Sequence, residues 1–521
     1  MIIKRATLLL ATAALAGCSF EPHYLRPTPP VPQSWPVGDA YLRQSEAALP
    51  SVAYTDVFKD PRLQQVIGQA LANNRDLRVA VADIEQARAE YRIQRADLFP
   101  EIDASAQATF RGGGNGTRTT TTGGGTGNGT GTGGTGTGTG TGAGTGTGIG
   151  GTTISTGNRS YNVDVGASAF EIDLFGRVRS LSHAALDQYF ATEAGARATR
   201  LTLVGEVATA WLTYAADQSL LKIALDTEKS AQQSVTLTQR RLDGGIAPRT
   251  DLRQAQTILD TAQSDVALQK TALAQDANVL QLLVGAPVDP ALLPASIEQV
   301  GGSLAELPAG LDSTVLLRRP DVVEAEYQLR AANAQIGAAR AALFPTISLT
   351  GLAGFASSAL SSLFTGGAFN YSVSPQISYP IFRAGAARAG VAESKAARDS
   401  AVATYEKAIQ TAFRDVADAL ARRGTIDAQA TADRNNVDHS LDNFRLSDAR
   451  YKGGIDTYLN SLDAQRTLYS AQRTYVATEL TKATNLVDLY TALGGDATIE
   501  ATAGGPVAPS PEPAGSPIPQ P

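Results

Sequence analysis

Two nearly identical stretches of nine residues most constrain how this chain can fold. RADLFPEID begins at Arg95 and RAALFPTIS begins at Arg340. A proline ends or kinks a helix because it lacks a backbone N–H and disfavours helical geometry in the residue before it. After each proline, apolar and polar residues alternate with period two, which indicates a strand. The sequence therefore predicts the same helix-to-strand transition twice, with Pro100 and Pro345 as the hinges.

A second pair of motifs extends the repeat over most of the chain. RRLDGGIAPRTDLRQAQ begins at Arg240 and ARYKGGIDTYLNSLDAQ begins at Ala449. The two motifs are 145 positions apart in the first half (Arg95 to Arg240) and 109 in the second (Arg340 to Ala449). The longer spacing coincides with residues 112–157, which are almost entirely Gly and Thr. Such a segment has too little apolar surface to pack, so we expect a flexible loop between two strands.

Four stretches of about ten residues alternate apolar with polar side chains, as membrane strands do. They lie at residues 101–110, 161–170, 346–355 and 371–380. In the first, Ile102 and Ala104 share one face while Asp103 and Ser105 share the other. A tilted strand of this length can cross a bilayer, but an ordinary soluble sheet with one wet face has the same pattern. Four membrane strands would leave open edges, so several chains would have to associate to close the sheet.

The segments between these strands are typical of very long helices. Residues 177–243 contain no proline, and residues 387–452 form a comparable segment. A helix of 67 residues is about 100 Å long. Each segment ends at a Gly-Gly pair, after which a second helix returns, at residues 250–283 and at residues 458–493. We therefore predict a mixed α and β fold of two internal repeats, each with a strand hairpin and a coiled-coil hairpin of long helices.

The N-terminus has the pattern of a bacterial secretory signal. Residues 1–17 combine a positively charged start, an apolar run and small residues, followed by Cys18. The ending Leu-Ala-Gly-Cys resembles the lipobox of bacterial lipoproteins, in which cleavage precedes a cysteine that is then acylated with palmitate or a related chain. An ordinary signal peptide with a chance cysteine is the alternative. In that class Ser19, which is not an aspartate, usually permits transport to the outer membrane.

Composition and motifs argue against several classes of function. The net charge is -6 and the pI is about 5.3, so we expect no binding to nucleic acid. The chain has neither a G-x-x-x-x-G-K-[ST] nor a G-x-S-x-G motif, and its three histidines have no metal-binding spacing. We therefore expect no enzyme activity, no metal and no cofactor beyond a covalent lipid on Cys18. No long apolar run follows the signal, so a membrane-spanning part would consist of strands.

Together these features resemble the TolC-like outer membrane efflux proteins, and within them the lipoprotein branch that serves drug exporters of the resistance-nodulation-division type. The resemblance rests on LAGC, YLRPTPPVPQSWP, LFPEI, LFPTI, FEIDLFGRVRS and YKGGIDTYLNSLDAQRTLYSAQ, and covers nearly all of residues 18–500. It implies a homotrimer with a twelve-strand β-barrel in the bacterial outer membrane and a long α-helical barrel in the periplasm. It also implies docking on a periplasmic adaptor (membrane fusion) protein and an inner-membrane pump, and passive conduction of drugs or other small molecules.

The resemblance and the repeats together divide the chain into five parts. These are a signal peptide at 1–17, a lipidated N-terminal extension at 18–55, repeats at 56–290 and 291–500, and a Pro-rich tail at 501–521. The Gly/Thr loop would then be extracellular. We expect the tail to be disordered because its composition cannot build a packed core.

The resemblance also implies a gate at the periplasmic helix tips. Leu459, Asp463 and Arg466 are spaced by four and three, so they share one face of the returning helix. They match a constriction of apolar and acidic rings with a salt-bridging arginine, in which three Asp463 carboxylates would attract cations. On the alternative interpretation, Asp463 and Arg466 are a solvated pair with no function.

A latch beside this gate is implied by the same match. Tyr451 corresponds to a tyrosine that ties one helix pair to its neighbour, with Thr250 and Asp251 as its partners. The chain departs from the pattern at Asp456, where some members carry an arginine, which puts an ion pair with Asp251 in doubt. Alternatively, Asp456 and Asp251 begin or cap the helices after each turn, where the helix dipole favours acids.

Two other functions fit part of the sequence. A lipid-anchored coiled-coil spacer or adhesin explains the signal, the long helices and the Gly/Thr segment, but not four strands of bilayer length in two hairpins. A type I protein-secretion duct has the same architecture, and the lipobox favours small-molecule efflux over it. The sequence specifies neither the transported substrates nor the particular pump and adaptor.

Overall fold

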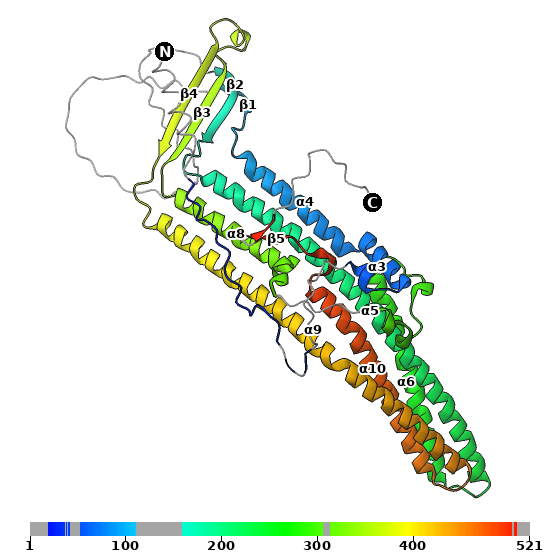
Figure 1. Cartoon of the computed structure of the whole chain (residues 1–521). Coiled ribbons are helices and arrows are strands. Elements are labelled where there is room, and N and C mark those ends of the chain that lie inside the picture. The colour runs from blue at the N-terminus through cyan, green and yellow to red at the C-terminus, as the bar shows by residue number, and fades with distance from the viewer. Residues whose placement is uncertain are drawn as a thin grey trace, which may run out of the picture. The chain divides into compact units, whose positions relative to one another are not determined.

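The computed structural model describes residues 19–36, 38, 40–41, 53–110, 159–305, 313–502 and 505–507. The predicted signal peptide, Cys18, the Gly/Thr segment 112–157 and the end of the tail lie outside these residues. The described chain is mostly helical and forms two compact units (Figure 1). The helical unit comprises Met1–Ala96, Phe175–Phe344 and Ile381–Pro521, and the strand unit comprises Asp97–Leu174 and Pro345–Pro380.

One very long helix dominates each half of the helical unit. α5 (Arg177–Asp243) and α9 (Ala386–Lys452) have 67 residues each. Each turns back into a second helix, α6 (Arg249–Val284) or α10 (Tyr458–Ala492). Gly245 and Gly454 in these turns have positive φ angles of 70° and 73°, a conformation that glycine adopts without strain. The Gly-Gly pairs therefore end the long helices as the sequence predicts.

Shorter helices complete the unit. They are α2 (Tyr54–Val57), α3 (Pro61–Asn73), α4 (Arg75–Ala96), α7 (Ile297–Val300) and α8 (Pro320–Ala341). Five 3-10 turns lie at Pro290–Leu292, Gly301–Ser303, Ser313–Arg318, Leu360–Ser362 and Gly495–Ala497, the fourth of them in the strand unit. Within the described residues, no helix is both long and apolar enough to cross a membrane.

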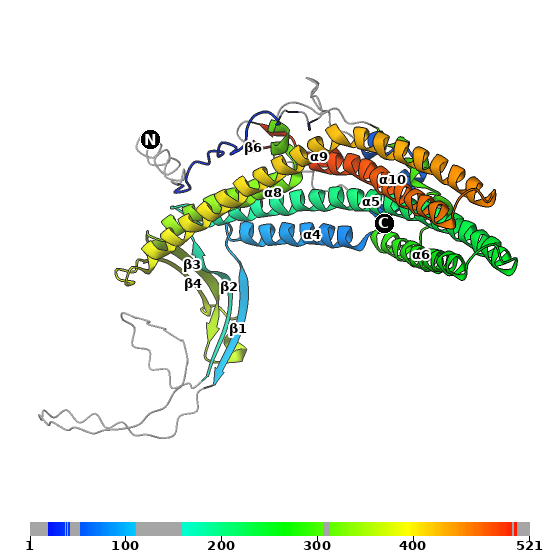
Figure 2. The same ribbon diagram turned by 90° about the horizontal axis from the view of Figure 1, so that it is seen from below.

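The helices pack as a layer. α5 contacts α4 and α6 on one side and α8 and α10 on the other, and α9 packs against α8 and α10 (Figure 2). The main core lies against one face of this layer. Leu201, Val204, Ala208, Trp211 and Ala215 of α5 all point into it, each no more than 7% exposed. Their spacing of three and four residues keeps them on one helical face.

The strand unit is an antiparallel sheet of order β1-β2-β3-β4. Its strands are β1 (Asp103–Phe110), β2 (Arg159–Glu171), β3 (Thr346–Ser357) and β4 (Phe369–Ser378). All four lie within two residues of the stretches chosen from the sequence. β2 and β3 pair with each other and so join the two repeats, and β1 and β4 form the edges of the described sheet.

The two prolines lie where helix gives way to strand. Pro100 is between α4 and β1, and Pro345 is between α8 and β3. The tail prediction needs a correction, because β5 (Ala501–Thr502) pairs with β6 (Gly505–Pro506). A residue of the N-terminal segment contacts this hairpin, since Arg26 Nη1 donates a hydrogen bond to the carbonyl oxygen of Thr502 at 2.9 Å.

Candidate functional site

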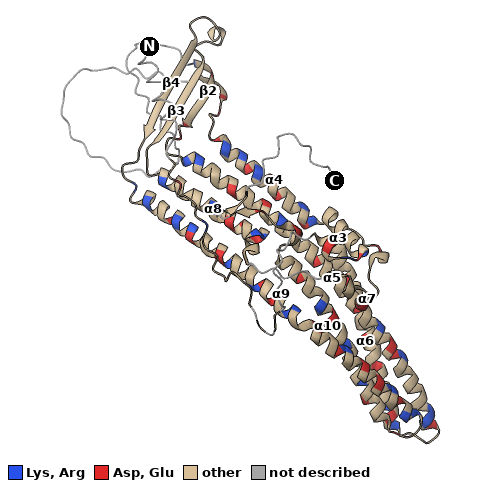
Figure 3. Ribbon diagram, in the orientation of Figure 1, with Lys and Arg blue, Asp and Glu red and all other residues tan. Residues whose placement is uncertain are grey.

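The proposed gate residues lie at the start of α10, in a region where charged side chains gather at the helix tips (Figure 3). Leu459, Asp463 and Arg466 are all exposed, whereas Tyr458 and Leu462 of the same helix are buried. The three therefore share one exposed face. In the described chain, no hydrogen bond or ion pair joins the side chains of Asp463 and Arg466, so the structure does not contain the solvated pair of the alternative interpretation.

Tyr451, in the last turn of α9, is 4% exposed and ties α9 to α5. Its Oη forms a hydrogen bond with Thr238 Oγ1 at 3.2 Å. The guanidinium of Arg241 lies over its ring, 4.6 Å from the centroid, and Nη1 donates to the Tyr451 carbonyl oxygen at 2.8 Å. The tyrosine thus links two helix hairpins within one chain through residues that precede the first turn.

The structure does not bring Thr250 or Asp251 to the Tyr451 hydroxyl within the described chain. The reason is geometric, because the end of α5 passes beside Tyr451, whereas both residues follow the turn in α6. Asp251 does lie near the same cluster. The pKa of Tyr458 is raised to about 12, first by burial and then by the charges of Tyr451 and Asp251.

Asp456 is engaged within its own turn. Its carboxylate accepts hydrogen bonds from the Thr457 backbone N–H at 2.8 Å, Arg450 Nε at 3.2 Å and Asn460 Nδ2 at 2.6 Å. The Thr457 N–H and the Arg450 guanidinium hold the pKa of Asp456 below its ordinary value. This favours the capping interpretation of Asp456 over a latch to Asp251.

A further link joins α6 to α10 above these residues. Tyr469 Oη donates to Asp265 Oδ2 at 2.6 Å, and burial raises the pKa of Tyr469 to about 12. Both residues line a cavity of about 240 Å³ together with Arg466. Sequence reasoning missed this pair because no local pattern connects two residues so far apart in the chain.

The N-terminal segment, residues 19–36, is fastened to the helical unit, which the sequence did not reveal. Nε and Nη2 of Arg26 both donate to Oε2 of Glu326, a carboxylate of α8 that is fully buried. Tyr24 Oη donates to Glu326 Oε1 at 3.1 Å, and Arg26 Nε also donates to Tyr405 Oη at 3.2 Å. Burial and the Glu326 charge raise the pKa of Tyr405 to about 12. The sequence signals this clasp only weakly, because Glu326 has Val322, Val323 and Leu329 as helical neighbours but also Arg330, whose Nη2 lies 3.9 Å from Glu326 Oε1.

The same segment begins where the chain passes between the two units. The ring of Phe20 stacks on Phe344 at 4.6 Å between centroids, and Phe344 stacks on Phe175 at 4.9 Å. Arg340 Nη1 donates to the Phe20 carbonyl oxygen at 3.1 Å. Phe175 directly follows the first segment of the strand unit, and Phe344 directly precedes the second.

Comparison with known proteins gives the class of this fold. A model of the family described as outer membrane efflux protein matches residues 66–286 and 311–495. The chain is 42% identical to the probable efflux pump outer membrane protein TtgC of Pseudomonas putida over 497 residues, which is 95% of this chain and 96% of the relative. It is 38% identical to the outer membrane protein OprJ of Pseudomonas aeruginosa, covering 94% of this chain and 95% of the relative.

A solved structure agrees with these matches. The open state of the MtrE outer membrane channel of Neisseria gonorrhoeae superposes with a TM-score of 0.76 at 34% identity, covering 92% of this chain and 98% of that one. The chain belongs to the outer membrane efflux protein family. The family assignment made from the sequence is thereby confirmed, and the protein is an outer membrane exit duct of an efflux system rather than an enzyme.

Proposed function

We propose that three copies of this chain close into one gated duct that passively conducts drugs or other small molecules from the periplasm to the exterior. The observation that carries this proposal is that both units end in edges without a partner in the described chain. The sheet ends at β1 and β4, and the helical layer ends at α4 and α6 on one side and α9 on the other.

The sheet gives the first part of the argument. A strand edge in lipid leaves backbone N–H and C=O groups unsatisfied, each at a cost of several kcal/mol. Pairing β4 of one copy with β1 of the next satisfies both edges. Two copies would supply eight strands, and side chains would fill the interior of such a barrel. Three copies would supply twelve strands and leave room for a passage.

The helical layer gives the second part. α4 has a single buried residue, Ala87, and exposes Val79, Val81 and Ile93, which are 58%, 55% and 69% exposed. Apolar side chains in such numbers on a helix at the edge of a layer favour burial against another copy. Packing α4 and α6 on α9 of the next copy would close the layer into a helical barrel.

The anchor and the partners follow from the same proposal. An acylated Cys18 would place its lipid in the outer membrane beside the start of the fastened N-terminal segment. Named relatives are components of efflux pumps, as TtgC is, so the duct would receive its cargo from an inner-membrane pump through a periplasmic adaptor. The tips of the helical barrel are the expected docking region.

The gate is the last element of the proposal. Leu459, Asp463 and Arg466 occupy one exposed face at the tip, where a threefold axis would gather three copies of each side chain. Like charges at close range repel and concentrate cations. The two hairpins of each chain would be held in the closed position by Tyr451 with Thr238 and Arg241, and by Tyr469 with Asp265. Thr250 and Asp251 would be free to make contacts between copies.

Single-channel conductance in a planar bilayer tests both duct and gate. We compare the wild type with Asp463→Ala/Arg466→Ala, and use Asp442→Ala/Arg445→Ala as the matched control because it removes an exposed pair of the same spacing from α9. A small wild-type conductance that rises only in the first variant supports the proposal. Equal large conductances would keep the duct and refute the gate, and inserted protein without conductance would favour the spacer or adhesin.

A further inference from the structure

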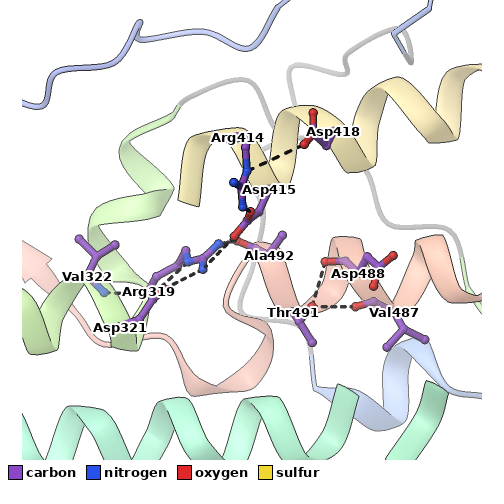
Figure 4. Close-up of polar contacts among 10 residues, drawn as sticks. All are labelled: Arg319, Asp321, Val322, Arg414, Asp415, Asp418, Val487, Asp488, Thr491 and Ala492. Carbon is purple, nitrogen blue, oxygen red and sulfur yellow. Dashed lines mark hydrogen bonds and ion pairs between the residues drawn. The ribbon is translucent and has the colours of Figure 1, made fainter. Parts of the chain in front are cut away.

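Two cavities of the helical unit differ in what they offer a ligand. The larger has a volume of about 450 Å³ and lies where α8 and α10 meet, and Figure 4 shows its charged groups. Its Arg319 is already engaged, because Nη1 donates to the carbonyl oxygen of Ala492 at 2.6 Å and Nη2 donates to Asp321 at 2.7 Å. Asn485 Oδ1 has no partner among the described residues, but its accessible surface is below 1 Å². A ligand in the larger cavity therefore cannot reach it.

The smaller cavity, of about 240 Å³, is lined by residues of α5, α6 and α10 near the helix tips. Ile258, Ala262 and Gln465 are buried in its wall, each no more than 9% exposed. Thr261 and Arg466 also line it and are exposed, so the cavity is open to solvent. Because a cavity of about 150 Å³ holds benzene, this one has room for a ring with a short polar chain.

Two opposite charges line this cavity without pairing. The Arg466 guanidinium has no hydrogen bond and no ion pair in the described chain. Asp265 accepts a hydrogen bond from Tyr469 Oη through Oδ2, whereas no group of the described chain bonds to its Oδ1. One cavity thus holds a free cation and a carboxylate with a free oxygen. Charge complementarity favours a ligand with both signs over a simple anion or a simple cation.

Gln465 is an independent sign that the cavity takes a ligand. It is 7% exposed, and its amide forms no hydrogen bond in the described chain. Neither of its amide atoms is among the described side-chain atoms that are both unpartnered and sealed from solvent, so the amide keeps accessible surface. A buried amide without a partner is unfavourable, and a ligand in the cavity would remove that cost. Unlike Asn485 Oδ1, this group is within reach of a ligand.

The rest of the wall suits an apolar group. The side chains of Ile258 and Ala262 and the ring of Tyr469 line the cavity. The Tyr469 hydroxyl is already used in its bond to Asp265, so the ring adds mainly apolar surface. Small-molecule sites commonly combine such a wall with a few polar groups that fix the orientation of the ligand.

We propose that this cavity binds a small zwitterion with an apolar body, an amphoteric acid about the size of an aromatic amino acid. Its carboxylate binds the Arg466 guanidinium and the Gln465 amide, and its ammonium group binds Asp265 Oδ1. Its apolar body lies on the apolar wall of the cavity.

A ligand in this position joins α6 to α10, as the bond between Tyr469 and Asp265 does. It contacts both helix hairpins of the chain at once, so separation of the hairpins would remove part of its contacts. A ligand that binds one state better shifts the population towards that state. The zwitterion would therefore keep the tips closed. This effect on the gate rests on the proposed function, whereas binding itself does not.

Ligand-observed NMR titration with the full-length protein in detergent tests the charges of the site with three related probes. L-Phenylalanine carries both charges, hydrocinnamate lacks the ammonium group, and phenethylamine lacks the carboxylate. We expect saturable binding of L-phenylalanine and binding about tenfold or more weaker for the other two, because each loses one set of charge-assisted hydrogen bonds. Equal affinities for the three probes, or no saturable binding of L-phenylalanine, would overturn the inference.

Variants assign the two charges to residues. Arg466→Gln should weaken binding of L-phenylalanine about tenfold or more without weakening that of phenethylamine. Asp265→Asn, which can still accept from Tyr469, should weaken L-phenylalanine without weakening hydrocinnamate, and Gln465→Leu should weaken L-phenylalanine while changing no charge. Arg445→Gln, an exposed change on α9 outside the cavity, should alter none of these affinities. Unchanged affinity in Arg466→Gln would refute the site, and the comparison of probes decides the question even where a variant fails to fold.

Single-channel conductance separates this inference from the proposed function. L-Phenylalanine at saturating concentration should lower the wild-type conductance, and hydrocinnamate at the same concentration should lower it less. Binding without any fall in conductance would refute the effect on the gate. A wild type that conducts but does not bind L-phenylalanine refutes the site alone, whereas one that binds it and never conducts refutes the duct.

Discussion

At the scale of single residues, the buried Glu326 helps to hold the N-terminal segment in place. Its carboxylate is reached by Arg26 and Tyr24 from this segment, while Arg26 also contacts Tyr405 of α9. Removing one member of a buried ion pair costs about 3–5 kcal/mol, because the other charge is left buried and unpaired. Here the loss would weaken the attachment of the N-terminal segment, which follows the proposed lipid anchor.

Glu326→Gln should therefore release residues 19–36 and destabilise the helical unit by about 3 kcal/mol. Faster amide hydrogen exchange and earlier proteolysis within this segment are the readout. Glu206→Gln, an exposed change of the same kind on α5, should have no such effect. Adding Arg26→Met to Glu326→Gln should restore part of the stability. An identical response of Glu326→Gln and Glu206→Gln would contradict the clasp.

Asp276 gives a prediction with a defined pH dependence. Burial first, and then Asp217, raise its pKa to about 6, and the pKa of Tyr214 is raised by burial first and then by the Asp276 charge. A carboxyl with a raised pKa in the folded state favours folding below its ordinary pKa and loses that contribution as the pH rises through about 6. Asp276→Asn should raise the midpoint temperature at neutral pH and change nothing near pH 4. Parallel pH profiles for the two proteins would disprove this assignment.

At the scale of elements, the links between the two helix hairpins decide how firmly the tips are held. Tyr451 and Thr238 join α9 to α5, and Tyr469 and Asp265 join α10 to α6. Both bonds connect a helix of the first repeat to one of the second. Breaking them should favour separation of the hairpins without unfolding either one.

Tyr451→Phe and Thr238→Val should each raise single-channel conductance, and the double variant should raise it no further. The two changes remove one and the same hydrogen bond, whose net contribution is about 0.5–1.5 kcal/mol. Tyr469→Phe removes an independent bond and should add to either variant. Additive effects of Tyr451→Phe and Thr238→Val would show that this bond does not hold the gate.

The elements also show what the sequence could and could not provide. The prolines and the period-two alternation are local, so they placed all four strands within two residues. The Gly-Gly pairs likewise ended both long helices correctly. The contact of Tyr451 with Thr238 and that of Arg26 with Glu326 span 213 and 300 positions. No local pattern encodes such pairs, and the resemblance pointed to Thr250 and Asp251 instead.

At the scale of the whole molecule, closure by three copies should depend on the exposed apolar face of α4. Val79→Asp/Ile93→Asp places charges on that face, so burial against another copy would become costly. We expect loss of trimers in native mass spectrometry of the detergent-solubilised protein, with the helix content of one chain retained. Leu446→Asp on the exposed side of α9 tests the opposite edge. Intact trimers in both variants would place the interface elsewhere.

Closure itself is the central claim, and disulfide cross-linking between sheet edges tests it most directly. The mature chain would have no free thiol, so Ser105→Cys in β1 and Ser372→Cys, Ser374→Cys or Gln376→Cys in β4, which all lie on one face of the sheet, can be paired two at a time. Two intervening strands keep these positions about 14 Å apart within one chain, too far for an internal disulfide. After oxidation in native outer membranes, we predict covalent products that end at three chains. Products that end at two chains, or none for any pair, would contradict the account.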